Sequence, residues 1–142
     1  MIASLRGNLV ATGTDWAIIE VNGVGFRVST PTSTLASLGK PGSSVYLHTH
    51  LHVREDNISL FGFSTFEELG LFQILTGVSG IGPKLAMSML SAMKPEELVG
   101  IIVAGNAEML TSIPGIGKKI AGRLILELKD IRLKKYYEPC LL

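Results

Sequence analysis

Cysteine is nearly missing from this sequence, in which Cys140 is the only example. A single cysteine excludes an internal disulfide and a cysteine-based metal site, and it fits a reducing, cytosolic compartment. A dominant sign of charge is missing as well, because 13 Lys and Arg residues balance 12 Asp and Glu residues to a net charge of +1. Overall charge therefore does not indicate a nucleic-acid-binding protein.

Long hydrophobic runs are also missing, although the mean hydropathy is high at +0.39. The uncharged stretch 69–83 is broken by glycines and a proline, which excludes a membrane span. Arg6 and Gly7 interrupt the apolar start, so no signal peptide is expected. The 142 residues suffice for one domain or two small ones with marginal cores, and the surplus apolar residues indicate subunit interfaces.

Residues 1–63 are predicted to be β structure. Short apolar-rich runs predict five strands, at 2–10, 16–21, 24–29, 45–54 and 58–63. Asn22-Gly23 is a strong signal for a type I′ hairpin turn, and 31–38 is expected to be a turn or short helix. Five short strands with one helical insert predict a Greek-key barrel of the OB type.

After residue 63 the apolar period changes from two to 3.6, so an all-α domain is expected over 64–135, with 136–142 as a tail or truncated linker. A capping box, formed by Ser64 or Thr65 with Glu67 or Glu68, begins its first helix. An apolar stripe of Phe66, Leu69 and Phe72 follows. Five short helices are predicted, which makes the fold class α+β.

Two segments of this domain, 78–86 and 113–121, align residue for residue at a constant offset of 35. In each, a Gly-Ile-Gly tripeptide leads directly into a helical pattern, and the isoleucine is expected to point into the core. Helix starts carry unpaired N–H groups and the positive end of the dipole, so they attract anions. Lys84, Lys118 and Lys119 occupy these first turns, and the repetition favours backbone–phosphate binding over simple helix capping.

Two other glycine-rich motifs do not fit. A Walker A loop requires a glycine where Ser112 stands and a Ser or Thr where Lys119 stands. A dinucleotide-binding fingerprint requires a third glycine at the positions of Leu85 and Ile120. The loops therefore predict no nucleotide cofactor.

A basic stripe follows the second segment. Seven basic residues lie between residues 113 and 135: Lys118, Lys119, Arg123, Lys129, Arg132, Lys134 and Lys135. Glu127 and Asp130 can pair locally with Arg123 and Lys134. From the residues alone, an ordinary solvated helix face and a DNA-binding face remain open.

The fourth predicted strand alternates apolar residues with His48, His50 and His52. Same-face residues of a strand lie about 7 Å apart, so a polar strand face is favoured over a metal site, and a role toward a nucleic acid stays open. The following turn, 54–57, contains Glu55 and Asp56. On composition alone it is a polar turn.

With these motifs in place, the chain resembles the RuvA family, bacterial subunits that recognise four-way (Holliday) DNA junctions. The resemblance covers nearly the whole chain and rests on VNGVGF at 21–26, VRED at 53–56, LFGF at 60–63, GIGPKLA at 80–86 and PGIGKK at 114–119. It implies a homotetramer that holds an open, square-planar junction on its basic face, and partnership with the hexameric ATPase RuvB.

The resemblance also implies roles for single residues. It implies phosphate contacts from Gly80, Gly82, Lys84, Gly115, Gly117, Lys118 and Arg123, to which the first-turn position adds Lys119. Glu55 and Asp56 match the acidic pin at the junction centre. Family members continue into a third domain that docks on the ATPase, whereas this sequence ends at Leu142 and 136–142 resembles no part of that domain.

Three functions are compared. A non-catalytic, cytoplasmic junction-binding protein without cofactor or metal is favoured. A helix-hairpin-helix repair enzyme requires an activated carboxylate or lysine, and no spacing singles one out. If the chain is a protein-interaction module with purely structural hairpins, no salt-dependent DNA binding is expected.

Overall fold

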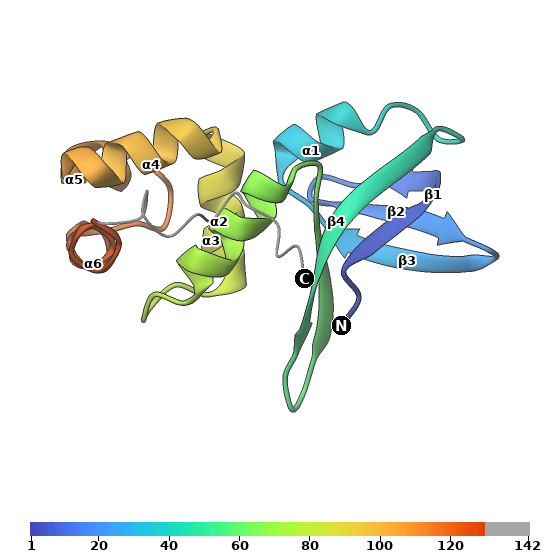
Figure 1. Cartoon of the computed structure of the whole chain (residues 1–142), viewed down its shortest axis with the longest axis horizontal. Coiled ribbons are helices and arrows are strands. Elements are labelled where there is room, and N and C mark those ends of the chain that lie inside the picture. The colour runs from blue at the N-terminus through green and yellow to red at the C-terminus, as the bar shows by residue number, and fades with distance from the viewer. Residues whose placement is uncertain (130–142) are drawn as a thin grey trace. The chain divides into compact units, whose positions relative to one another are not determined.

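A computed structural model describes residues 1–129, so Arg132, Lys134, Lys135, Cys140 and the predicted tail at 136–142 lie outside the described residues. The chain divides into two compact units, Met1–Leu69 and a second that begins at Gly70. The domain boundary predicted at 63/64 remains a prediction. Figure 1 shows the elements of both units.

The first unit contains five strands: β1 (Ser4–Thr12), β2 (Trp16–Val21), β3 (Val24–Ser29), β4 (Ser44–Val53) and β5 (Ile58–Phe63). They close a barrel in the order β1-β2-β3-β5-β4, in which only the β3–β5 pairing is parallel. A short helix, α1 (Thr32–Ser37), connects β3 to β4. The predicted OB-type barrel with one helical insert is confirmed.

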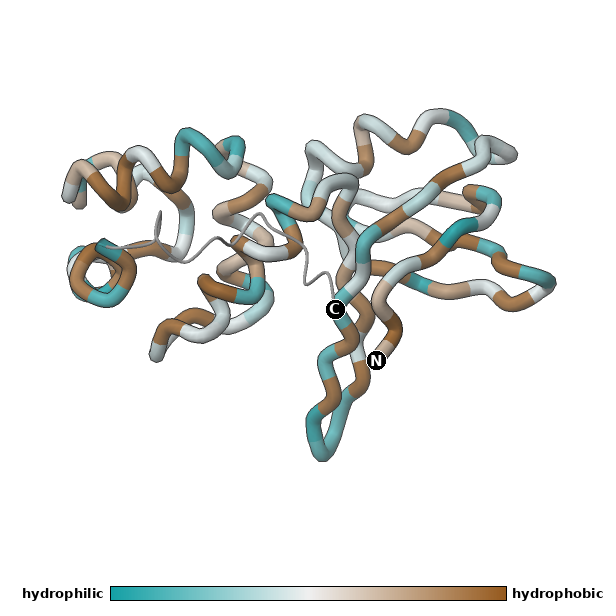
Figure 2. Tube along the Cα trace, in the orientation of Figure 1, coloured by the Kyte–Doolittle hydropathy of each residue, from teal (hydrophilic) through white to brown (hydrophobic). Residues whose placement is uncertain are grey.

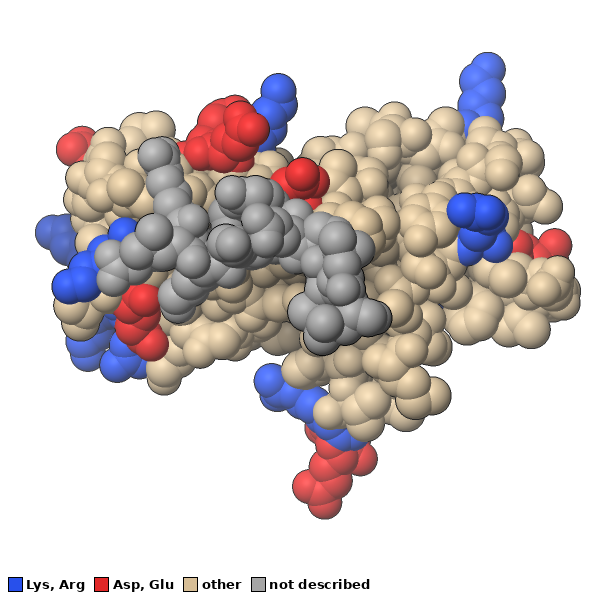
Figure 3. All heavy atoms as spheres, viewed as in Figure 1, with Lys and Arg blue, Asp and Glu red and all other residues tan. Residues whose placement is uncertain are grey.

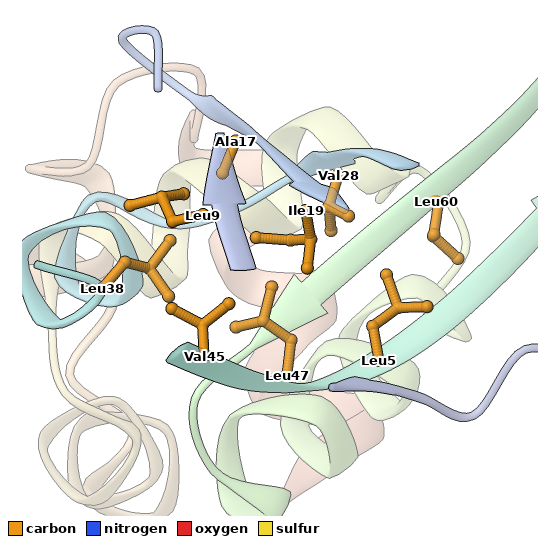
Figure 4. Packing of buried hydrophobic residues seen from close by; sticks show 9 residues of the cluster. All are labelled: Leu5, Leu9, Ala17, Ile19, Val28, Leu38, Val45, Leu47 and Leu60. Atoms are coloured by element: carbon orange, nitrogen blue, oxygen red, sulfur yellow. The ribbon is translucent and has the colours of Figure 1, made fainter. Parts of the chain in front are cut away.

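The barrel is held together by apolar side chains that alternate inward along the strands. Figure 4 shows them pointing toward one another from the strands and from the end of α1: Leu5, Leu9, Ala17, Ile19, Val28, Leu38, Val45, Leu47 and Leu60. Burying a Val, Leu or Ile side chain of this kind contributes about 1.5–3 kcal/mol. The barrel is therefore a rigid base for the hairpin that leaves it.

Gly62 on β5 is the position where this core is tightest. A Cβ there would lie 2.5 Å from Val28 Cγ1 and 3.1 Å from Leu47 Cδ1. We expect Gly62→Ala to destabilise the barrel by about 1–3 kcal/mol through overpacking. The midpoint of urea unfolding measures this, with Gly25→Ala as the matched control, because a Cβ at Gly25 meets only Ile18, at 3.6 Å. Equal midpoints for the two variants would contradict the packing described here.

The first turn of helix α2 (Phe66–Thr76) contains a buried carboxylate, that of Glu68. Ser64 and Thr65 donate hydrogen bonds to Glu68 Oε1 at 2.9 and 3.1 Å, and Ser33 and Thr34 donate to Oε2 at 3.4 and 3.5 Å. Thr65 Oγ1 also accepts from the Glu68 amide at 3.2 Å, which is the capping interaction predicted from the sequence. Hydroxyl donors thus compensate for the desolvation of Glu68.

The predicted apolar stripe on α2 is partly wrong. Leu71, Phe72 and Leu75 are fully buried, whereas Phe66 is 42% exposed and its ring lies 3.9 Å from that of His48. In the first turn, the side chain of Glu68 points inward. Phe66 precedes it by two residues, or about 200° around the helix, and therefore points away from the buried side. The buried face therefore begins at Glu68.

Four further helices follow in the described part of the chain: α3 (Pro83–Ala92), α4 (Pro95–Ala104), α5 (Ala107–Thr111) and α6 (Lys118–Leu128). The ends of α4 and the start of α5 carry residues typical of helix boundaries. Pro95 occupies the first turn of α4, Gly105 ends it with φ +70°, and Asn106 Oδ1 accepts from the Met109 amide at 3.2 Å at the start of α5. Between residues 1 and 129, no helix has the length and apolar character needed to cross a bilayer.

Candidate nucleic-acid interface

The two repeated segments form hairpins with matching hydrogen bonds. The first hairpin joins α2 to α3 through residues 77–82, and the second joins α5 to α6 through 112–117. The Ile81 and Ile116 amides donate to Val78 O and Ile113 O at 3.0 and 3.1 Å. One supersecondary unit therefore occurs twice in three dimensions, as the offset of 35 predicts.

Each hairpin has one glycine that the backbone requires and one that it does not. Gly80 and Gly115 have φ values of +92° and +91°, the left-handed region that favours glycine. Gly82 and Gly117 are extended, with φ −90° and −93°, and a Cβ on either would meet no atom of residues 1–129 within 4 Å. Folding therefore does not demand glycine at these two positions, and the missing side chains leave the backbone open to close approach by a ligand.

Isoleucines between the glycines anchor both loops. Ile81 and Ile116 are 4% and 5% exposed, and the preceding Val78 and Ile113 are equally buried. The prediction that these isoleucines point into the core is confirmed. With its apolar side chains buried and its glycines exposed, each loop presents backbone rather than side chains to the solvent.

In the described part of the chain, the starts of α3 and α6 carry lysines but neither a capping side chain nor an acidic residue in the first turn. Gly82 and Gly117 are the N-cap residues. Lys84, Lys118 and Lys119 are exposed in these turns. Since lysine at this end opposes the helix dipole, both starts are suited to an external anion such as a phosphate.

The second hairpin has more groups that can bind an anion than the first. Pro83, which has no N–H group, stands where the second hairpin has Lys118. The second hairpin therefore has one more amide donor and one more ammonium group in its first turn. In Figure 3 the blue spheres of Lys and Arg gather around the position at which Figure 1 places α6.

Arg123 on α6 connects the two hairpins. Its Nη1 donates to the Ser79 carbonyl of the first hairpin at 3.3 Å, while its Nε lies 3.9 Å from Glu127 Oε2. The Arg123–Glu127 pair considered from the sequence is thus present, whereas the Asp130–Lys134 pair lies outside the described residues. A second contact joins the hairpins, because a Cβ on Gly115 would lie 3.0 Å from Leu85 Cδ1.

Glu55 and Asp56 form the tip of the hairpin between β4 and β5. The Arg54 amide donates to the Asn57 carbonyl at 2.7 Å and closes the turn, while Val53 pairs with Ile58 below it. The hairpin extends beyond the barrel in Figure 1; its tip is hydrophilic in Figure 2 and negatively charged in Figure 3. Two exposed carboxylates are therefore held on a stiff projection of the first unit.

The three histidines of β4 contact neighbouring side chains of the first unit. His48 lies against Tyr46 and Phe66, and His52 Nε2 accepts from Arg54 Nε at 2.8 Å. Burial lowers the pKa of His48, with Glu67 opposing it, and burial also lowers the pKa of His50, helped by His52 and the amino terminus. Their contribution to stability falls as the pH drops through the ordinary histidine value of 6.5, because the unfolded chain then binds more protons.

Among residues 1–129, no cluster of histidine, cysteine or carboxylate side chains is arranged to hold a metal ion. The structure brings the two groups of glycines and lysines together within one unit and places Glu55 and Asp56 on the other. Sequence reasoning missed the Arg123–Ser79 bond and the Leu85–Gly115 contact. No local pattern indicates either of them, because both join residues that are 30 or more positions apart.

A five-stranded barrel followed by two hairpins with exposed glycines and lysines at the helix starts is the architecture of a DNA-binding protein of the tandem helix-hairpin-helix class. The family model described as RuvA N terminal domain matches residues 1–62, and the SAM-like helix-hairpin-helix tandem model matches 72–130. The chain belongs to the RuvA family.

Several relatives share the name "Holliday junction branch migration complex subunit RuvA". The relative from Dehalococcoides mccartyi is 56% identical over 138 residues, which are 97% of this chain and 71% of the relative. The relative from Geobacter sulfurreducens is 56% identical over 92% of this chain and 65% of its own length, and that from Herpetosiphon aurantiacus is 52% identical over 91% and 66%. The chain thus spans 65–71% of the length of these three relatives.

Proposed function

We propose that this chain binds four-way (Holliday) DNA junctions without catalysing a reaction on them, and holds them open for branch migration in recombination and repair. The observation that carries the proposal is the pair of equivalent hairpins, whose exposed glycines and lysines suit two phosphates. The name of the relatives supports the junction as the DNA structure that is bound. A cytoplasmic location fits a bacterial protein that acts on chromosomal DNA.

In this proposal the phosphates meet backbone amides at Gly80, Gly82, Gly115 and Gly117. The lysines Lys84, Lys118 and Lys119 add charge, as does Arg123. Contacts to phosphates position a protein on DNA but do not read its bases. Recognition of a junction must therefore come from shape, which requires several copies of the hairpin pair in a fixed arrangement.

A homotetramer with fourfold symmetry supplies that arrangement, with one pair of hairpins for each junction arm. Glu55 and Asp56 of the four copies then surround the junction centre and keep separated strands away from it. We further propose that a separate ATPase of the RuvB type provides the motor, in keeping with the "branch migration complex" in the name of the relatives.

Native mass measurement with and without a four-way junction tests this assembly. We expect four copies of the chain on each junction, because each copy serves one arm. A linear duplex of the same arm sequence is the control, and it should not organise four copies in this way. A single copy bound to each junction would contradict the fourfold arrangement.

Lys118 tests the electrostatic part of the proposal. On a linear duplex that fits one pair of hairpins, Lys118→Ala should reduce the magnitude of the salt dependence, d log K/d log[salt], by about 0.9, because one phosphate is no longer neutralised. Base preference should stay the same, because a lysine–phosphate contact carries no sequence information. Lys94→Ala, an exposed lysine before α4, is the control for charge alone. An unchanged slope together with an altered base preference would contradict the assignment.

A further inference from the structure

The bond between Arg123 and the Ser79 carbonyl departs from the internal repeat. At the offset of 35, Arg123 corresponds to Ser88 and Ser79 corresponds to Pro114. Ser88 donates to the Lys84 carbonyl of its own helix at 3.2 Å. No reciprocal bond therefore joins this pair of positions, and the connection runs from the second hairpin to the first.

The second contact between the hairpins is one-sided as well. Gly115 packs close to Leu85, but a Cβ on its counterpart Gly80 would meet no atom of the described residues within 4 Å. The first hairpin loop is thus open around Gly80, a residue with φ +92°, and Ser79 directly before it receives the guanidinium. Glu127, at 3.9 Å, orients the Arg123 side chain from its other edge.

We propose that Arg123 is a positioning residue, which holds the loop of the first hairpin in register with the second so that both helix starts present phosphate sites at a fixed separation. This inference rests on the proposed DNA binding. In addition to contributing charge, Arg123 thereby positions the phosphate site at Gly82, which belongs to the other hairpin. A guanidinium has five N–H donors, so holding the Ser79 carbonyl leaves donors for a phosphate.

The physical reason is preorganisation. Two phosphate sites on one rigid body bind a duplex more tightly than two independent sites, because the second contact forms without a further loss of freedom. A loop that contains Gly80 has many accessible backbone conformations. Tying its carbonyl to α6 selects one of them before DNA arrives.

Double-mutant cycles on a short linear duplex test this role. Arg123→Gln removes the forked donor, and it is combined with Gly82→Val, which blocks the first hairpin, or with Gly117→Val, which blocks the second. If Arg123 positions the first hairpin, Arg123→Gln weakens binding by about tenfold in the unmodified protein but by less than about threefold once Gly82 is replaced. In the Gly117→Val background the reduction should stay near tenfold.

A role confined to a phosphate contact within the second hairpin predicts the opposite pattern, in which Gly117→Val removes the effect of Arg123→Gln. Coupling to Gly82 that exceeds coupling to Gly117 supports the positioning role, and equal or smaller coupling overturns it. Measurements at low salt keep the double variants within range, because affinity rises steeply as salt falls. Lys94→Gln controls for the removal of one charge and should couple to neither glycine.

The melting temperature serves as the control for correct folding. Arg123→Gln should leave it unchanged, because the Arg123 side chain is 53% exposed. Arg123→Lys gives an independent comparison, since it retains the charge but lacks the planar fork. It should show the same coupling to Gly82 as Arg123→Gln. If Arg123→Lys binds the duplex as tightly as the unmodified protein, charge alone matters and the inference is overturned. Failure of the unmodified protein to bind DNA would overturn the proposed function itself.

Discussion

Replacing both Gly82 and Gly117 by valine is expected to abolish most DNA binding while leaving the fold intact. Each valine places its branched side chain in front of the amides at a helix start. A hydrogen bond to a charged group is worth about 1.5–3 kcal/mol, so blocking both sites should weaken binding by at least about 100-fold. The reduction should be alike for all base sequences, because the contacts proposed for the blocked groups are to phosphates alone.

The structure explains why these two glycines are the right ones to replace. Both have extended φ angles, and a Cβ on either meets no atom within 4 Å in the part of the chain that the structure describes, so the variants should fold. Gly80 and Gly115 would be poor choices, since their positive φ angles strain any other residue. Gly100→Val within α4, where a Cβ also has open space, is the matched control for a new valine. Unchanged affinity in a folded Gly82→Val, Gly117→Val protein would rule out the hairpins as phosphate sites.

Neutralising the acidic tip by Glu55→Gln together with Asp56→Asn is expected to tighten duplex binding and to lower the preference for four-way junctions. Two like charges 4 Å apart repel by about 1 kcal/mol in water and by more where solvent is excluded. Stacking of one base-pair step is worth about 1.4 kcal/mol. The tip is therefore too weak to melt long stretches of DNA, but the four tips of the proposed tetramer would steer separated strands from the centre and disfavour continuous duplex.

The ratio of junction to duplex affinity measures this effect. The control is Glu96→Gln with Glu97→Gln, which removes another exposed, adjacent acidic pair, in the first turn of α4. That control changes the net charge by the same amount away from the hairpin tip. If the tip variant and the control give the same affinity ratio, Glu55 and Asp56 are an ordinary polar turn.

Features encoded by a few neighbouring residues were predictable from the sequence. Asn22 and Gly23 adopt φ values of +50° and +86°, the type I′ turn that their order predicts. The two hairpins were predictable because the same glycines and isoleucines occur twice, and the buried isoleucines confirm the expected orientation. Strand alternation and turn chemistry operate over a few residues, so they can be read without the tertiary structure.

Features that depend on distant residues were not predictable. Phe66 follows the apolar pattern of α2 but lies beside His48, because hydroxyls from α1 stabilise Glu68 in the inward position. The resemblance implied a phosphate contact for Arg123, but its bond to Ser79 spans 44 positions and follows no local pattern. Nor does a sequence tell which glycine of each Gly-Ile-Gly has a positive φ. The backbone shows that it is the first.

The central claim is that this chain recognises the shape of a four-way junction through contacts to phosphates. Competition between a four-way junction and a linear duplex with the same arm sequences, repeated with a second, unrelated set of sequences and at several salt concentrations, tests it most directly. We predict that the junction is preferred in both sequence sets, and that log K falls linearly with log[salt] for both forms of DNA. Equal affinity for junction and duplex, or a preference that changes with the base sequence, would contradict the account.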